Sequence, residues 1–382
     1  MNVCSIILLT ITVLVAKGKF NTTDLHEKIF KGYNKDAIPR RNVTEAVNVN
    51  LSLVLYSIHD VNEKYQTISF RAVLDIQWKD EFLTWNPDHY GDVKSITVPS
   101  EKIWIPDIVL QDTVGYITDS IKKDGRAMIN HNGRVTIWPN DLYTVACKLS
   151  IKKFPFDKQT CLLDFLSWTS PSSVIQLENS DTNWIPQDHD ILEKGEWYLQ
   201  NVRIINQSKI FNREDWAHVI FIFEIQRKSL FHIVNSLIPV ILISILDVMC
   251  FVLPSESGER VGLSISIFLT LTIFLYAVNS TLPESSDEVA VFTIFIGFQI
   301  LGSALSVVMT NISLYFYFKN AQDPIPFLLW YFAKVFCMKK NTTKNTKVTW
   351  HMVSRASDRL CLLSAVIWHP VLIASLFIAA YQ

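Results

Sequence analysis

Glycine and cysteine are scarce in this chain, which has 11 glycines and 6 cysteines among 382 residues. The sequence contains no glycine-rich phosphate loop and no nucleophile elbow. His59, His89, His131 and His218 show no metal-ligand spacing. A formal net charge of −1 gives no electrostatic case for nucleic-acid binding. We therefore expect a protein that is not an enzyme and has no metal site, no cofactor and no nucleic-acid partner.

Long apolar runs are missing from residues 20–228, although the chain as a whole is 49% hydrophobic. Residues 1–18 have the apolar core of a secretory signal peptide. N-x-S/T sequons, which fit a secreted segment, cluster in the same half and make candidate glycosylation sites of Asn21, Asn42, Asn50 and Asn206. We therefore expect residues 19–228 to form an extracellular domain.

Period-two patterns dominate this extracellular half. The apolar side chains of Phe70, Leu74 and Trp78 recur at even spacing, and residues 219–225 repeat the pattern. Turn-forming residues such as Asn132-Gly133 separate these short stretches. The pattern predicts an immunoglobulin-like β-sandwich.

Only two cysteines, Cys147 and Cys161, lie in this half, and 13 residues separate them. Two cysteines alone in a secreted domain are expected to pair. The tip of the loop that they close, Phe154-Pro155-Phe156, is apolar and needs a surface to pack against. That surface is either the membrane helices downstream or the sandwich itself.

The second half contains four apolar segments, which predict a bundle of four transmembrane helices: Phe231–Leu253, Gly258–Tyr276, Val289–Phe318 and Leu360–Gln382. The first three fall within residues 229–318, and the fourth occupies residues 360–382. Residues 319–359 hold eight Lys or Arg side chains and predict a cytoplasmic loop, so both termini should lie outside the cell. Asp247, inside the first segment, is either functional or a structural hydrogen-bond partner.

The second segment carries an unusual number of hydroxyl groups for a lipid-facing helix. From Val261 to Val278 it would span about 27 Å, enough to cross a bilayer core. At helical spacing one face presents small, polar and apolar side chains in turn: Gly262, Ser266, Leu269, Ile273, Tyr276 and Ser280. This face indicates either a pore lining that Leu269 and Ile273 can close by dewetting, or a packed helix whose hydroxyls bond its neighbours.

Together these features resemble the Cys-loop, or pentameric ligand-gated, ion channels. The resemblance rests on the spacing of Cys147 and Cys161, on Phe154-Pro155-Phe156-Asp157 between them and on Trp104-Ile105-Pro106-Asp107. Residues 78–87 look similar to the cation-channel branch, especially to serotonin type 3 receptor subunits, and the zinc-activated channel has a similar sequence at 258–261. The resemblance implies a homo- or hetero-pentamer in the plasma membrane that passes cations when an extracellular small molecule binds. A postsynaptic membrane is one location that it implies.

The resemblance also implies roles for individual residues. Glu259 matches the ring that selects cations, and Leu269 matches the gate. Trp168, Trp216 and Asp112 match positions of the agonist pocket. Coupling between pocket and pore is implied for Glu63, Phe154, Pro155, Phe156, Arg227 and Pro283.

Two departures from the family pattern affect the expected activity. Val73 stands where the family usually has tryptophan, and no vicinal cysteine pair precedes Trp216. We therefore also consider an accessory subunit that needs a partner subunit, and a channel opened by zinc or protons.

Overall fold

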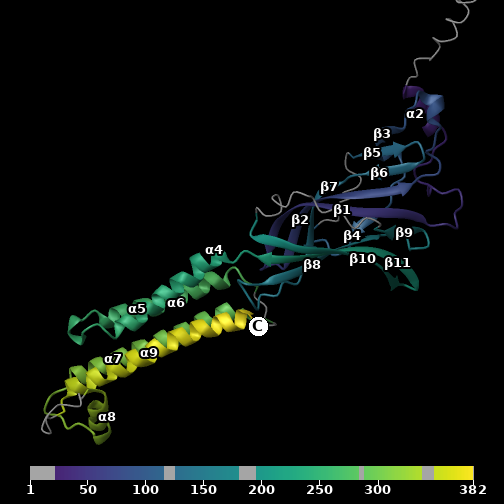
Figure 1. Ribbon diagram of the computed structural model, residues 1–382. Helices are drawn as coiled ribbons and strands as arrows, with labels where there is room; N and C mark the ends of the chain where they lie inside the picture. The colour runs from purple at the N-terminus through teal and green to yellow at the C-terminus, as the bar shows by residue number, and fades with distance from the viewer. Residues whose placement is uncertain (1–21, 116–124, 180–194, 284–287, 338–347, 382) are drawn as a thin grey trace, which may run out of the picture.

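The computed structural model describes residues 22–115, 125–179, 195–283, 288–337 and 348–381. The predicted signal segment and Asn21 lie outside these residues. Figure 1 shows a β-sheet domain from which the apolar helices extend in one direction. The α7–α9 pair, Val291–Tyr317 and Trp350–Tyr381, runs beside the pair α5–α6, Ile238–Cys250 and Arg260–Asn279.

The extracellular domain consists of two sheets, preceded by the helix α2, Thr22–Phe30. One sheet has the strand order β3-β5-β6-β2-β1-β9, with β7 also paired to β2, and the other has the order β10-β11-β8-β4. The strands of the first sheet are β1 Val47–Asn62, β2 Thr67–Lys79, β3 Ser95–Pro99, β5 Arg126–Asn130, β6 Arg134–Ile137, β7 Asn140–Ala146 and β9 Ile175–Glu178. Those of the second are β4 Ile108–Leu110, β8 Lys158–Ser167, β10 Trp197–Phe211 and β11 Glu214–Arg227.

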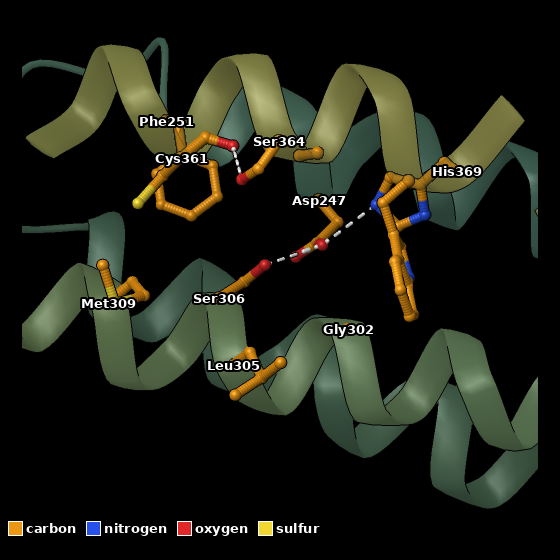
Figure 2. A pocket seen from close by; sticks show the side chains of 11 residues that line it. Asp247, Phe251, Gly302, Leu305, Ser306, Met309, Cys361, Ser364 and His369 are labelled. Atoms are coloured by element: carbon orange, nitrogen blue, oxygen red, sulfur yellow. Dashed lines mark hydrogen bonds and ion pairs between the residues drawn. The ribbon is translucent and has the colours of Figure 1, made fainter. Parts of the chain in front are cut away.

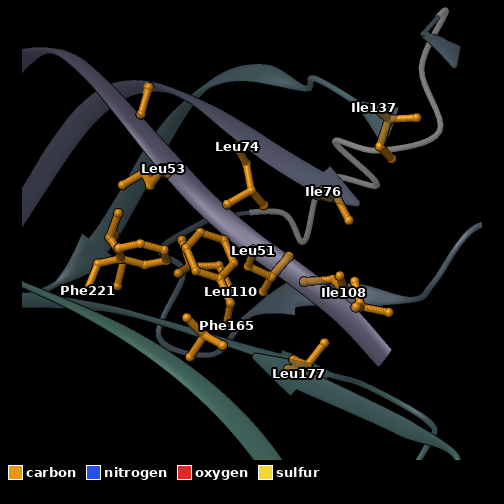
Figure 3. Packing of buried hydrophobic residues seen from close by; sticks show 14 of the residues in the cluster. Leu51, Leu53, Leu74, Ile76, Ile108, Leu110, Ile137, Phe165, Leu177 and Phe221 are labelled. Carbon is orange, nitrogen blue, oxygen red and sulfur yellow. The ribbon is translucent and has the colours of Figure 1, made fainter. Parts of the chain in front are cut away.

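The core of the sandwich follows from the alternation in β2 and β11. Phe70, Leu74 and Trp78 on β2 are at most 3% exposed, and Val219 and Phe221 on β11 are at most 1% exposed. Because successive side chains of a strand point to opposite faces, such a pattern buries one face against the other sheet. Figure 3 shows these faces meeting, with side chains of β1 and β2 opposite those of β8 and β11. The predicted β-sandwich is confirmed.

The Asn132-Gly133 turn lies between β5 and β6, as its sequence predicts. Gly133 has a φ of +84°, which L-residues with side chains rarely adopt. A Cβ atom there would also collide with the carbonyl oxygen of Asp80. Glycine is therefore required at this position for two independent reasons.

Within the described residues, four helical segments are long and apolar enough to cross a membrane: Leu230–Cys250, Arg260–Asn279, Val291–Tyr317 and Trp350–Ala379. Leu230–Cys250 comprises α4 Leu230–His232, a π-helical stretch Ile233–Leu237 and α5. Pro239 lacks an amide hydrogen, which is a physical reason for irregular helical bonding just before it. The bundle of four apolar helices predicted from the sequence is confirmed.

The connection between α7 and α9 contains a further short helix, α8, Phe327–Cys337. It falls within residues 319–359, which the sequence assigns to the cytoplasmic loop. The last apolar helix begins at Trp350, ten residues before the segment expected from hydropathy. A polar first part, including Asp358, therefore belongs to the same continuous helix as the apolar part.

Candidate functional site

A hollow of about 540 Å³ lies at the end of the four-stranded sheet, beside the β10–β11 hairpin. Its walls mix aromatic, aliphatic and basic side chains: Gln111, Leu166, Trp168, Lys209, Ile210, Phe211, Trp216 and His218. Aromatic faces in such a hollow can hold a small organic ligand. Two of the three residues expected in the agonist pocket, Trp168 and Trp216, are brought together here.

Trp168 follows β8 in a loop that Asp107 holds in place. The Trp168 amide donates to the Asp107 carbonyl oxygen at 3.0 Å, and the Ser167 hydroxyl donates to the Asp107 carboxylate at 2.6 Å. The amide of Thr169 donates to the same carboxylate at 2.7 Å. Asp107 is the last residue of the Trp-x-Pro-Asp motif, so this motif fixes the backbone that presents the Trp168 ring, which is 59% exposed.

Trp216 is half-buried on β11, directly opposite Lys209 on β10. The Phe211 ring meets it edge-on at a centroid distance of 6.4 Å. Asp112 is exposed and does not line this hollow, although its neighbour Gln111 does. The geometry within one chain therefore places Trp168 and Trp216 in a common wall and leaves Asp112 outside it.

A polar cluster beside the hollow was missed from the sequence. Asp164, whose side chain is 3% exposed, receives a bond from Lys209 Nζ at 2.6 Å and lies 2.7 Å from His218 Nδ1. His218 follows Trp216 by two positions on β11, so strand alternation puts both on one face. That alternation was the available signal, but only the pairing of β8, β10 and β11 brings Asp164 within reach.

At the opposite end of the sandwich, Arg227 forms a buried charge cluster just before α4. Its guanidinium bonds Asp157 at 2.8 and 3.2 Å and Glu63 at 2.6 Å. It also lies over the rings of Trp197 and Phe154, 4.2 and 5.1 Å from their centroids. Burial lowers the pKa of Arg227, but the hydrogen bonds and charges of Asp157 and Glu63 outweigh this effect and raise it overall.

The tip of the disulfide loop packs against the membrane helices and not back onto the sandwich. Phe154 is 6% exposed and contacts the rings of His232 and Phe292 at 4.9 and 6.2 Å. The amide of Val291 donates to the Lys152 carbonyl oxygen at 3.0 Å. Phe156 approaches Phe377 near the end of α9, at 6.4 Å between ring centroids.

Cys147 and Cys161 form the expected disulfide, whereas Cys250 and Cys361 are free thiols. Pro283 is half-buried after Leu282, which packs in the same apolar cluster as Phe154. The structure thus gathers Glu63, Arg227 and Phe154 at one junction, and Phe156 contacts α9 beside it. Their role in gating stays a prediction.

One face of the α6 helix meets no partner among the residues that the structure describes. Gly262 and Ser266 are exposed, and Leu269, Ile273 and Tyr276 are 53%, 70% and 78% exposed. Its opposite face is buried against the other helices through Arg260, Ser264, Ile267, Leu271 and Val278. The face that the sequence assigns to a pore is therefore the one that the folded chain leaves open.

The hydroxyl groups of α6 bond to their own helix. Ser266 donates to the Gly262 carbonyl oxygen at 2.8 Å, and Thr270 donates to that of Ser266 at 2.7 Å. Thr272 donates to the Phe268 carbonyl oxygen at 2.6 Å. These bonds argue against the alternative that the hydroxyls hold neighbouring helices together.

Asp247 makes contacts with two other membrane helices (Figure 2). Ser306 on α7 donates to its carboxylate at 2.9 Å, and His369 on α9 lies 3.3 Å from it. Nδ1 of His369 lies 2.6 Å from the side-chain oxygen of Gln299. Asp247 is 2% exposed, so these contacts support the reading of a structural hydrogen-bond partner inside the bundle.

Three of the four candidate glycosylation sites lie in the described residues, and they differ in accessibility. Asn42 and Asn206 are exposed, and Asn206 exchanges hydrogen bonds with the backbone of Asn179 at 3.1 and 3.3 Å. Asn50 is half-buried in β1, between β2 and β9. Glycosylation at these positions stays a prediction.

Comparison with known families gives two matches that cover most of the chain. Residues 22–229 match the neurotransmitter-gated ion-channel ligand binding domain, and residues 236–326 match the neurotransmitter-gated ion-channel transmembrane region. The first match contains the hollow and the disulfide loop, and the second contains the open face of α6.

Individual relatives are acetylcholine receptor subunits. The neuronal alpha-2 subunit of Gallus gallus is 35% identical over 75% of this chain and 54% of its own length. The alpha-like subunit of Manduca sexta is 34% identical over 81% of this chain and 62% of its own length. For the neuronal beta-3 subunit of Gallus gallus the values are 32%, 76% and 63%. The chain thus spans between half and two thirds of the length of these relatives.

These matches confirm the resemblance at the level of the family, whereas similarity to serotonin type 3 receptor subunits in particular stays a prediction. The family is not enzymatic, as the sequence predicts. Four spanning helices within this family also indicate a multi-pass protein of the plasma membrane. The fold, the disulfide loop and both family matches agree that this chain belongs to the neurotransmitter-gated ion-channel family.

Proposed function

We propose that this chain is one subunit of a pentameric, cation-selective channel opened by a small extracellular molecule. The observation that carries the proposal is the open face of α6. Its exposed apolar side chains include Leu269, Ile273 and Tyr276, at 53–78% exposure. Large apolar side chains exposed along one stripe need a partner surface or a confined space. Five copies of α6 around an axis would supply both.

Within such a ring, the α6 face explains a closed and an open state. Leu269 and Ile273 would form an apolar girdle that excludes water when narrow. Ser266, nearer the foot, exposes a hydroxyl to the same path. Glu259 is exposed at the N-terminal end of α6, where five carboxylates would concentrate cations.

The hollow at Trp168 and Trp216 is the proposed agonist site. The hollow is not enclosed by a single chain, which fits completion by a neighbouring subunit that contributes Val73 from β2. Because aromatic faces attract cations, we propose an organic cation as the agonist. The sequence favours serotonin, and the names of the relatives favour acetylcholine.

A separate observation supports a second candidate function, that of an accessory subunit. The charged group on the wall of the hollow is basic: Lys209, whose ammonium is neutralised by Asp164. A cationic agonist gains no carboxylate from this wall, and Val73 offers no aromatic ring from the other side. These features favour an accessory subunit that assembles with agonist-binding partners.

The selectivity assignment is tested by Glu259→Gln, which removes the charge and keeps the shape. We expect reversal potentials under ion substitution to show weaker preference for cations over anions. Glu256→Gln is the matched control, because Glu256 is also exposed near the foot but is bonded by the Tyr317 hydroxyl at 2.8 Å. An unchanged reversal potential in Glu259→Gln would remove Glu259 from the selectivity ring.

Expression of the chain alone in oocytes tests which agonist opens the channel and whether the chain is only an accessory subunit. The cells are exposed in turn to serotonin, acetylcholine, choline, zinc, copper and acid. Current from the lone subunit contradicts the accessory function and identifies the agonist class. The accessory function is supported if the chain gives no current when expressed alone but alters the current when it is expressed together with an acetylcholine receptor subunit.

The proposed topology places both termini outside the cell. It follows from the sandwich outside, four crossings and the basic connection between α7 and α9. Antibody access to a C-terminal tag on intact cells tests it. Labelling only after permeabilisation would contradict it. A postsynaptic location is tested by antibody staining of neurons, which should label synapses.

A further inference from the structure

Two adjacent residues of opposite charge at the foot of α6 have opposite environments. Glu259 is exposed, whereas Arg260 is 1% exposed and is among the largest fully buried side chains of the described residues. An arginine beside the proposed selectivity ring would cancel the charge that attracts cations. The structure removes it from that position.

Asp358 on α9 is the charged partner of Arg260. Its Oδ1 atom lies 2.6 Å from Nη2 of the guanidinium, and the side chains are 17% and 1% exposed. Arg260 Nη1 also donates to the Ser255 hydroxyl at 3.3 Å, and the guanidinium carbon lies 5.5 Å from the centre of the Phe251 ring. The pair therefore joins the foot of α6 to the polar first part of α9.

Asp358 is itself oriented by α7. The Ser313 hydroxyl donates to the same carboxylate at 2.6 Å and lies 3.0 Å from the Ser354 hydroxyl. The nearby basic side chain of Arg359 points elsewhere and donates to the Phe336 carbonyl oxygen at 2.7 Å. Three helices thus converge on one carboxylate whose charged partner is Arg260.

We propose that Asp358 is a positioning residue for ion selectivity, which holds Arg260 inside the bundle and cancels its charge, so that Arg260 does not offset the field of Glu259 at the inner mouth. This inference rests on the proposed cation channel. The ion pair of Arg260 and Asp358 has no net charge. Removing the charge of one member leaves the charge of the other without compensation. Asp358→Asn leaves a net positive charge near the mouth, and Arg260→Gln leaves a negative one.

The two single substitutions should therefore act in opposite directions on cation flow. In five copies, one unbalanced charge per subunit at the edge of a screened mouth changes local cation concentration by about two- to threefold. We expect Asp358→Asn to lower unitary sodium conductance by about that factor and Arg260→Gln to raise it. A purely structural role predicts damage of the same sign in both variants.

The double variant Arg260→Gln/Asp358→Asn completes the test. It removes both charges, so no unpaired buried charge destabilises the fold, and its conductance should return to that of the parent. If Asp358→Asn alone fails to reach the surface, comparing the double variant with Arg260→Gln still measures the effect of Asp358. A double variant that conducts like Arg260→Gln would overturn the proposal.

The measurement is single-channel recording of the full chain, with whichever partner subunit it needs, in symmetrical sodium. Glu259→Gln is recorded in parallel. If Glu259→Gln changes nothing, the proposed pore itself fails. If Glu259→Gln lowers conductance but Asp358→Asn and Arg260→Gln leave it unchanged or shift it in the same direction, the role of Asp358 alone is refuted.

Discussion

Replacing Arg227, which lies in a buried charge cluster, should lower the stability of the fold far more than replacing one member of an exposed ion pair. In Arg227→Gln the Asp157 carboxylate, 2% exposed, loses its charged partner, and Glu63, 18% exposed, loses the same one. Breaking a buried pair by removing one member costs about 3–5 kcal/mol, because a charge remains without compensation. The guanidinium contacts with Trp197 and Phe154 are lost as well.

This loss of folding free energy should appear as a lower melting temperature, Tm. For a domain of this size each kcal/mol shifts Tm by about 2–4 °C, so Arg227→Gln should lower Tm by roughly 10 °C. The assay is the temperature at which the detergent-purified full chain loses its monodisperse peak. Arg227→Gln/Asp157→Asn should recover part of the loss, since it removes the most deeply buried unpaired charge.

Arg203 supplies the matched control on the neighbouring strand. Arg203 and Glu224 are 2.6 Å apart, but their side chains are 57% and 35% exposed. An exposed pair of this kind contributes about 0–1 kcal/mol, so Arg203→Gln should shift Tm by no more than roughly 4 °C. Equal shifts for Arg227→Gln and Arg203→Gln would refute the reasoning from burial.

Three further predictions concern other parts of the chain. Burial raises the pKa of Asp80 above its ordinary 3.8, so the folded chain binds this proton more tightly than the unfolded chain and loses stability as the pH rises through the raised pKa. Asp80→Asn should flatten that part of the Tm–pH curve, and an unchanged slope would contradict this. A Cβ atom on Gly302 would lie 2.7 Å from Nε1 of Trp368, whereas one on Gly297 meets nothing within 4 Å. Gly302→Ala should therefore cost about 1–3 kcal/mol and lower Tm, and Gly297→Ala should not; equal melting temperatures would refute the packing argument. Trp168→Ala should raise the agonist concentration for half-maximal current by roughly tenfold, given about 1–2 kcal/mol for a desolvated cation–π contact, and an unchanged dose–response curve would remove Trp168 from the pocket.

The parts of the site that the sequence predicts are those encoded locally. The alternation in β2, the apolar tip at Phe154 and the face of α6 each follow from residues close together in the chain. Asp164 and His218 were not recognised, because 54 positions separate them and only the pairing of β8 with β11 joins them. The start of α9 at Trp350 was missed for a related reason, since hydropathy detects the apolar part of a helix and not its polar extension.

The N-terminal end of α6 shows which features the sequence determines and which depend on the tertiary structure. The sequence by itself determines that Glu259 and Arg260 are neighbours at the end of a hydroxyl-rich helix, that two cysteines close a loop, and that four segments can cross a membrane. It does not determine which of the two charges faces the ion path. Consecutive helical residues point about 100° apart, so the rotation of α6 against its neighbours decides. That rotation is set by the packing of α6 against the other helices, where Asp358, 98 positions away, receives the guanidinium of Arg260.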